Sequence, residues 1–323
     1  MSERPDPIDL AALRGSVAII TGAANNGIGW GLCRYAAGEL GMHVVLVDLH
    51  AQPVREAQAR LQAEFDMVTC LGVQADVTDP AALAACLASV QATFPGTHIG
   101  AVFANAGVIF NRTILKSTLE EWTTTLNVNV IGVVNTLKTF VPELQKQAAP
   151  SVVVNTASIG GLVRGDGGGA AYQASKHAVV ALSESLAFEL AVKHPQIRVH
   201  VLCPCIVQSG LAETSKLNAR VRAGELADGD VNALQPPGYG VRAMTPERHA
   251  QQVFDHIAAG NFYMITDNVR PYVDHDHPFD GLGLVRERMQ NMLELKLDNA
   301  DAFAQPADRP PSAILKGPFW QDP

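Results

Sequence analysis

Two side chains with complementary acid–base chemistry, Tyr172 and Lys176, stand four residues apart. They open a helical pattern that we expect to run from Ala170 to Lys193, so both fall on one helical face. A phenol with an ordinary pKa of about 10 is a poor base at neutral pH, but a neighbouring ammonium favours the phenolate. Such a pair suits proton exchange with an alcohol or carbonyl oxygen. The alternatives are an ordinary surface pair and, for the nearby hydroxyl of Ser158, a turn or helix cap.

A glycine-rich stretch follows the first apolar run of the chain. Gly22, Gly27 and Gly29 come directly after Val17–Thr21 and lead into a helical pattern. Glycines at a strand-to-helix turn let backbone N–H groups and the helix N-terminus approach a diphosphate. Asp48 ends the next apolar run, close to the spacing of about 20 residues at which an acidic residue binds the adenosine ribose. The stretch favours a dinucleotide site, with an ordinary turn and a capping role for Asp48 as the alternative.

The elements that must position these residues alternate between strand and helix patterns, which is typical of βαβ units and a parallel sheet. We expect strands at Val17–Thr21, His43–Asp48, Val68–Gln74, Gly100–Ala104, Ser151–Asn155, Arg198–Leu202 and Phe262–Ile265. We expect helices at Ile28–Leu40, Pro53–Phe65, Pro80–Thr93, Leu119–Gln147, Ala170–Lys193 and Pro246–Ala259. The sequence therefore predicts a doubly wound α/β fold of the Rossmann type. We expect a tail over 1–13, one domain over 14–269 and a C-terminal extension over 270–323.

Composition narrows the classes of protein that the chain can belong to. Its 323 residues are 47% hydrophobic and 17% charged, which suits a globular protein with a sizeable core. A formal net charge of −8 argues against binding to nucleic acid. No apolar run reaches the roughly 20 residues that span a bilayer, and the polar start of the chain is unlike a secretory signal. Five cysteines in apolar patterns indicate reduced thiols and a cytoplasmic location.

Two other stretches carry metal-like chemistry. Cys203 and Cys205 flank a proline, a spacing that a metal-binding or redox pair could use. The sequence has no second cluster of such residues to match it. The stretch from Asp274 to His277 alternates carboxylates and imidazoles within a polar, proline-containing segment. We interpret it as a solvated loop and expect no metal site.

Over roughly residues 15–209 the chain resembles the short-chain dehydrogenase/reductase family. The glycine turn resembles the family's TGxxxGxG motif, with one residue more between Gly22 and Gly27. Asp76-Val77 resembles the pair that borders the adenine, and Asn105-Ala106-Gly107 resembles the family's NAG motif. Where the family has Pro-Gly after the sixth strand, this chain has Pro204-Cys205, and the cysteine side chain is expected to narrow the site.

The resemblance implies a catalytic set of Asn129, Ser158, Tyr172 and Lys176. Asn129 would hold a water in a proton relay, Ser158 would bind the substrate oxygen, and Tyr172 would be the acid/base. Lys176 would bind the nicotinamide ribose and lower the pKa of the phenol. The resemblance also implies cofactor contacts at Gly22, Asn26, Gly27, Ile28, Gly29, Asp48, Leu49, Asp76, Val77, Asn105, Ala106, Gly107, Tyr172, Lys176, Pro204, Val207 and Ser209.

The function that these residues predict is an NAD(H)-dependent oxidoreductase that interconverts a secondary alcohol and a ketone. NAD is expected rather than NADP, because a carboxylate at Asp48 would repel a 2′-phosphate and no Lys or Arg follows it directly. The C-terminal part of the domain distantly resembles family members that act on bulky aromatic alcohols, which favours a bulky apolar or aromatic substrate. A non-catalytic dinucleotide-binding sensor is one alternative, disfavoured by the intact catalytic set. An NAD-dependent epimerase or dehydratase is another, disfavoured by the glycine spacing and the lack of a separate substrate domain.

The segment 209–244 departs from the alternating pattern. Leu211, Leu217 and Val221 are spaced through it among charged residues, which predicts one or two amphipathic helices beside the reaction centre. We interpret the segment as a substrate lid, with a fixed surface insertion as the alternative. Apart from a small-molecule substrate, the partner we expect is a second copy of the chain in a homodimer, with a homotetramer as the alternative.

Overall fold

The computed structural model describes residues 8–162, 169–222, 224–225 and 243–266. Seven parallel strands form one sheet in the order β3-β2-β1-β4-β5-β6-β7. They are β1 (Val17–Thr21), β2 (His43–Asp48), β3 (Cys70–Gln74), β4 (Ile99–Ala104), β5 (Ser151–Thr156), β6 (Ile197–Cys203) and β7 (Tyr263–Ile265). The order reverses between β1 and β4, and this reversal confirms the predicted doubly wound parallel sheet.

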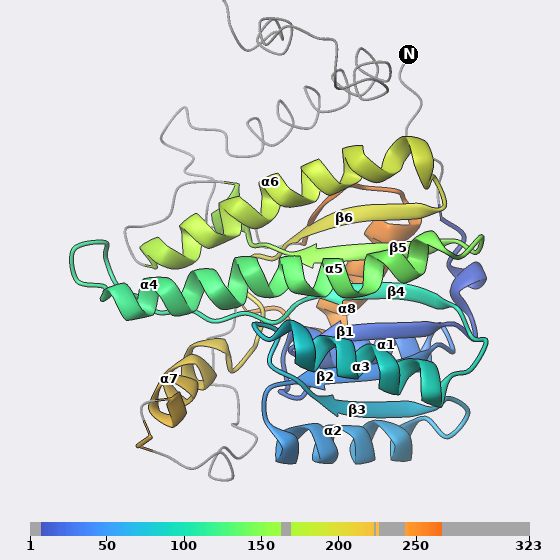
Figure 1. The fold of residues 1–323 in the computed structure, drawn as a ribbon, viewed down its shortest axis with the longest axis horizontal. Helices are drawn as coiled ribbons and strands as arrows, with labels where there is room; N and C mark the ends of the chain where they lie inside the picture. Colours follow the sequence, from blue (N-terminus) through green and yellow to red (C-terminus); the bar gives the residue numbers. More distant parts are fainter. Residues whose placement is uncertain (1–7, 163–168, 223, 226–242, 267–323) are drawn as a thin grey trace, which may run out of the picture. The chain divides into compact units, whose positions relative to one another are not determined.

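Helices cover both faces of this sheet. They are α1 (Ile28–Gly38), α2 (Ala51–Glu64), α3 (Pro80–Thr93), α4 (Leu119–Leu126), α5 (Gly132–Gln145), α6 (Ala170–Lys193), α7 (Leu211–Arg222) and α8 (Pro246–Ala258). Figure 1 shows α3, α4, α5 and α6 in front of the sheet and α1 and α8 behind it. Because both faces are covered, every residue of β1, β4 and β5 is buried, which explains their continuous apolar sequences.

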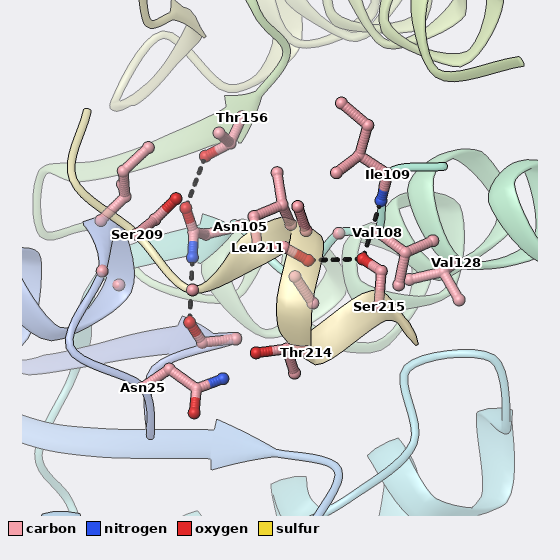
Figure 2. Close-up of a pocket in the computed structure, with 18 of the residues that line it drawn as sticks. Asn25, Asn105, Val108, Ile109, Val128, Thr156, Ser209, Leu211, Thr214 and Ser215 are labelled. Carbon is pink, nitrogen blue, oxygen red and sulfur yellow. Dashed lines mark hydrogen bonds between the residues drawn. The ribbon is translucent and has the colours of Figure 1, made fainter. Parts of the chain in front are cut away.

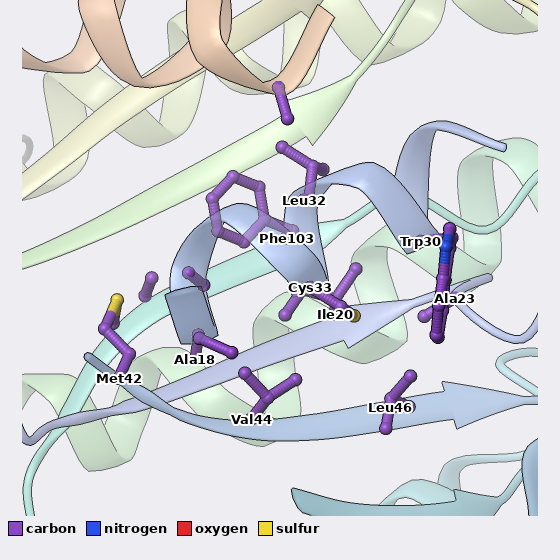
Figure 3. Close-up of a cluster of buried hydrophobic side chains, with 14 of the residues drawn as sticks. Ala18, Ile20, Ala23, Trp30, Leu32, Cys33, Met42, Val44, Leu46 and Phe103 are labelled. Atoms are coloured by element: carbon purple, nitrogen blue, oxygen red, sulfur yellow. The ribbon is translucent and has the colours of Figure 1, made fainter. Parts of the chain in front are cut away.

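The core behind the sheet joins strand and helix side chains. Figure 3 shows Ile20 and Phe103 of the central strands beside Leu32 of α1, with Val44 on the neighbouring strand. The same cluster contains apolar side chains of α2 and α8, among them Phe254, whose ring lies edge-on to Phe103 with centroids 5.7 Å apart. This packing fixes the strands whose carboxyl ends carry the site.

One predicted helix is interrupted. The pattern Leu119–Gln147 forms α4, then a π-helical turn at Asn127–Ile131, then α5. A π-helical turn holds one residue more than an α-helical turn, and such turns are frequent at functional sites. Other boundaries match the prediction or shift by at most two residues, as at the start of β3, where the prediction began at Val68 and the strand begins at Cys70.

The ends of the domain are described only in part. Within the predicted tail 1–13, residues Leu10–Leu13 form a 3-10 helix and Leu13 is fully buried. The predicted extension 270–323, and with it the stretch Asp274–His277, lies outside the described residues. Among the helices that the structure does describe, none combines the length and the apolar character needed to cross a bilayer. Within the same ranges no group of three metal-ligating side chains comes together, and none of the five cysteines, all of which are described, forms a disulfide.

Candidate active site

A cavity of about 570 Å³ lies at the carboxyl ends of the strands, between the residues that follow β1 and β4. Crevices at this reversal point are where open α/β sheets bind ligands, and the volume lies in the range of small-molecule sites. The cavity is lined by these predicted site residues: Gly22, Gly27, Ile28, Gly29, Asp48, Leu49, Asp76, Val77, Asn105, Ala106, Gly107, Ser158, Tyr172, Lys176, Pro204, Val207 and Ser209. Asn26 and Asn129 are not among the lining residues.

The glycine turn forms one wall of the cavity, and its glycines are required by close packing. Gly22 has a φ of +67°, and a Cβ there would lie 2.7 Å from the Ala106 Cα. A Cβ on Gly29 would clash with the carbonyl oxygen of Gly22. Gly27 precedes α1 and gives no side-chain cap, so the N–H groups of the first helical turn keep their capacity for an anion.

The extra residue of the turn is accommodated by an outward side chain. Asn25 lines the cavity, whereas Asn26 accepts a hydrogen bond of 3.1 Å from the guanidinium of Arg60 on α2. That guanidinium lies 4.4 Å from the ring centroid of Trp30. The side chain predicted for cofactor contact is thus directed to a surface pair, and its neighbour Asn25 takes the inward position that sequence reasoning missed.

Asp48 ties the end of β2 to the glycine turn. Its carboxylate accepts hydrogen bonds from the backbone N–H groups of Ala24, at 2.9 Å, and Leu49, at 2.8 Å. Burial raises the pKa of this carboxyl, and the two N–H donors and the nearby His50 oppose that rise. The carboxylate oxygens line the cavity and have lone pairs left for further donors such as ribose hydroxyls.

The residues after β4 hold three strand ends together. The amide of Asn105 donates to the backbone oxygens of Thr21 and Gly22, at 3.0 and 3.2 Å. Its amide oxygen accepts from the hydroxyl of Thr156 at the end of β5, 3.2 Å away (Figure 2). This network fixes the floor of the cavity between β1, β4 and β5.

Ser158, Tyr172 and Lys176 meet at the same cavity from two elements. Ser158 follows β5 and caps a short 3-10 helix, Ile159–Gly161, by accepting from the Gly160 N–H at 3.1 Å. Gly161 packs directly on the backbone of Lys176, where a Cβ would lie 2.6 Å from the lysine carbonyl oxygen. This contact holds the turn that carries Ser158 against the first turns of α6. Ser158, Tyr172 and Lys176 therefore line the same cavity.

The ammonium of Lys176 is buried beside the phenol. Its Nζ donates to the Thr156 carbonyl oxygen at 2.7 Å and lies 5.5 Å from the ring centroid of Tyr172. Burial lowers the pKa of Lys176 to about 8, because removing the ammonium from water penalises its charged form. Lys176 therefore changes charge close to neutral pH.

Asn129 lies behind the cavity wall, on the π-helical turn. Its fully buried side chain accepts from the Val108 N–H at 2.8 Å and donates to the Val108 carbonyl oxygen at 3.0 Å. It also donates to the hydroxyl of Ser175 at 2.9 Å. Asn129 thus joins the loop after β4 to α6, one residue from Lys176, although it does not line the cavity.

One side of the cavity is formed by α7, which belongs to the predicted lid segment 209–244; residues 226–242 of that segment lie outside the described residues. Figure 2 shows Ser215 between Leu211 on its own helix and Ile109 on the loop after β4. The Ser215 hydroxyl accepts from the Ile109 N–H at 2.9 Å and donates to the Leu211 carbonyl oxygen at 2.6 Å. Leu217, which the apolar spacing singled out, does not line the cavity. Other lining residues that were missed are Thr124, Val128, Phe110, Asn111 and Thr156, none of which stands in a motif.

Comparisons with known proteins agree with this geometry. The sequence profile of the short chain dehydrogenases matches residues 16–219. The 1-deoxy-11-beta-hydroxypentalenate dehydrogenase of Streptomyces avermitilis is 33% identical over 279 residues, covering 82% of this chain and 99% of that protein. The C alpha-dehydrogenase of a Sphingobium species is 28% identical over 250 residues, covering 77% of this chain and 79% of that protein.

Solved structures show the same fold. A short chain dehydrogenase/reductase from Burkholderia phymatum in complex with NAD superposes with a TM-score of 0.66 at 26% identity, covering 93% of this chain and 99% of that one. Levodione reductase superposes with a TM-score of 0.66 at 25% identity, covering 81% of this chain and all of that one.

Proposed function

We propose that this chain, which belongs to the short chain dehydrogenase family and is an oxidoreductase of that family, interconverts a secondary alcohol and a ketone with NAD(H). The observation that carries the proposal is the convergence of Ser158, Tyr172 and Lys176 on a cavity that also holds the glycine turn. Neither feature alone requires redox chemistry. Together they support an acid–base group at a site that fits a dinucleotide.

The residues of the cavity fit a nicotinamide dinucleotide. Gly22 and Gly29 leave no space for a Cβ, and α1 presents an N-terminus without a side-chain cap. Such a turn lets backbone N–H groups approach a diphosphate. Asp76, Val77 and Val128 line the cavity as a surface for the adenine. When bound, the nicotinamide supplies the hydride acceptor or donor.

We infer a preference for NAD over NADP from the end of β2. The half-buried carboxylate of Asp48 lines the cavity and would repel a 2′-phosphate. The next two residues are Leu49 and His50, and the imidazole of His50 is engaged with Asn218 on α7, 2.7 Å away. Arg60 on α2 is held over Trp30 and bonded to Asn26.

In the mechanism we propose, Tyr172 moves the proton. Its hydroxyl gives a proton to the carbonyl oxygen during reduction, and its phenolate oxygen takes the proton from the alcohol oxygen during oxidation. The ammonium of Lys176, 5.5 Å from the ring centroid, favours the phenolate electrostatically. The Ser158 oxygen already accepts the Gly160 N–H, so its own O–H remains to orient the substrate oxygen.

The apolar part of the cavity lining supports a bulky apolar or aromatic substrate. Ile109, Phe110, Ile206 and Leu211 contribute apolar side chains to its lining. By their names, one relative acts on 1-deoxy-11-beta-hydroxypentalenate and one structural neighbour acts on levodione. We therefore expect alicyclic and aryl ketones to be better substrates than short aliphatic ones.

We also propose a homodimer that buries an apolar stripe on α4 and the π-helical turn. Leu119, Leu126 and Ile131 are 85%, 38% and 46% exposed there. Large apolar side chains exposed along one stretch favour an interface. Sedimentation velocity tests this directly, since the parent should sediment as a dimer and Ile131→Asp should shift it toward the monomer. A monomeric parent would exclude the dimer.

The activity is tested by supplying aliphatic, alicyclic and aryl secondary alcohols and ketones with NAD(H) and with NADP(H). The proposal predicts turnover followed at the NADH absorbance and a kcat/KM ratio that favours NAD. A protein that binds NADH without turning over any of these compounds would be the dinucleotide sensor. A ratio that favours NADP would overturn the role given to Asp48.

A further inference from the structure

Helix α7 is tied to the body of the domain by two side chains on one of its faces. Ser215 accepts a hydrogen bond from the Ile109 N–H, 2.9 Å away. Asn218, three residues later on the same face, has its Oδ1 2.7 Å from the Nε2 of His50. Because the amide oxygen can only accept, the imidazole Nε2 donates in this pair.

The second tie lies at one particular end of the cavity. His50 is buried directly before α2 and stands two residues after Asp48. Asp48 and Leu49 line the cavity together with Asn218 and Ala219 of α7. The pair therefore closes the cavity beside the carboxylate that the proposed function assigns to the adenosine ribose.

Within the described residues, most other side chains of α7 are only half-buried. Among the residues of the helix whose side chains are described, Ser215 alone is buried, and Lys216 and Arg220 are exposed. Segments with few buried apolar contacts open at a low free-energy cost. The position of α7 over the cavity consequently depends on its two hydrogen-bonded ties.

We propose that His50 and Asn218 are positioning residues that hold α7 across the adenosine end of the cavity and so slow the release of the dinucleotide. The inference rests on the proposed function, because it takes the cavity to be the dinucleotide site. A dinucleotide leaving past α7 has to displace this helix, and the His50–Asn218 bond must break first. Tyr172 and Ser158 lie outside this tie, so the chemical step is left unchanged.

The test measures the dissociation of NADH from the full-length protein by stopped-flow fluorescence, with excess NAD as the trap. Asn218→Leu keeps the side-chain size and removes the acceptor. The loss of one net hydrogen bond predicts release that is faster by roughly two- to tenfold. Lys216→Gln, an exposed neighbour on α7, is the matched control and should release NADH at the parent rate.

A double-mutant cycle distinguishes one shared interaction of His50 and Asn218 from two independent effects on the rate of NADH release. His50→Leu should accelerate release as much as Asn218→Leu does, and the double variant should be no faster than either single variant. His50→Gln keeps an N–H donor and should restore much of the parent rate. Equal release from the parent and Asn218→Leu, or effects that multiply in the double variant, would overturn the inference. A parent that fails to bind NADH would instead overturn the proposed function.

Discussion

Two buried histidines predict that the folded protein loses stability in mild acid. Burial lowers the pKa of His200 on β6 to about 4, and it does the same for His249 on α8. Nearby positive charge on Arg198 and His256 adds to the effect at His200, and a hydrogen bond to the Asn261 carbonyl oxygen opposes it. A histidine in the unfolded chain has a pKa of about 6.5. Between these two values the unfolded state binds more protons, so the free energy of unfolding falls as pH falls.

The magnitude follows from the two pKa values. Lowering the pH from 7 to 5 should cost about 2 kcal/mol for each histidine, and about 4 kcal/mol for the pair. In a domain of this size, 1 kcal/mol shifts the melting temperature by roughly 2–4 °C. The pair alone should therefore lower Tm by about 8–16 °C over these two pH units.

Differential scanning fluorimetry of the parent and His249→Leu at both pH values measures this effect. Neither ring nitrogen of His249 has a partner among the described residues, so leucine removes the titrating group without breaking a hydrogen bond. The variant should show about half of the histidine-dependent fall in Tm. His177→Asn, at an exposed position on α6, should behave as the parent. An equal fall in the parent and His249→Leu would refute the reasoning.

Two further substitutions test the cofactor site. Lys176→Met should weaken NADH binding and slow turnover. In the parent, the affinity for NADH should fall as the pH rises through about 8, because the Lys176 ammonium loses its proton there. An NADH affinity that stays constant in fluorescence titrations between pH 7 and 9.5 would contradict this. Gly29→Ala should weaken dinucleotide binding by on the order of tenfold or more, because a Cβ there meets the Gly22 carbonyl oxygen and such overpacking costs roughly 1–3 kcal/mol. An unchanged dinucleotide affinity, measured by calorimetry, would show that the turn does not hold the diphosphate.

Local patterns were sufficient to predict most of the fold, and together with the family resemblance they named part of the cavity lining. The strands β1, β4 and β5 are fully buried, so their apolar runs are continuous and easy to recognise. The spacing of Tyr172 and Lys176 puts both on one face of α6, and the packing of Gly161 on the Lys176 backbone brings Ser158 to the same cavity.

Features that depend on distant partners could not be predicted in this way. No local sequence pattern marks the π-helical turn, because its Asn129 is held by hydrogen bonds to Val108 and Ser175, which are distant in the sequence. Which asparagine of the glycine turn faces inward depends on Arg60, 34 residues after Asn26. The tie between His50 and Asn218 joins residues 168 positions apart, and it depends on the position of α7 over the cavity, which no local pattern indicates.

The central claim is that Tyr172 transfers the proton at a dinucleotide site, and one variant tests it most directly. Tyr172→Phe keeps the ring beside Lys176 and removes only the hydroxyl. It should bind NADH as the parent does and lose about 10²–10⁴-fold in the rate of the chemical step, measured in single turnovers of the best ketone from the panel. Retention of more than half of the parent rate under these conditions would contradict the account.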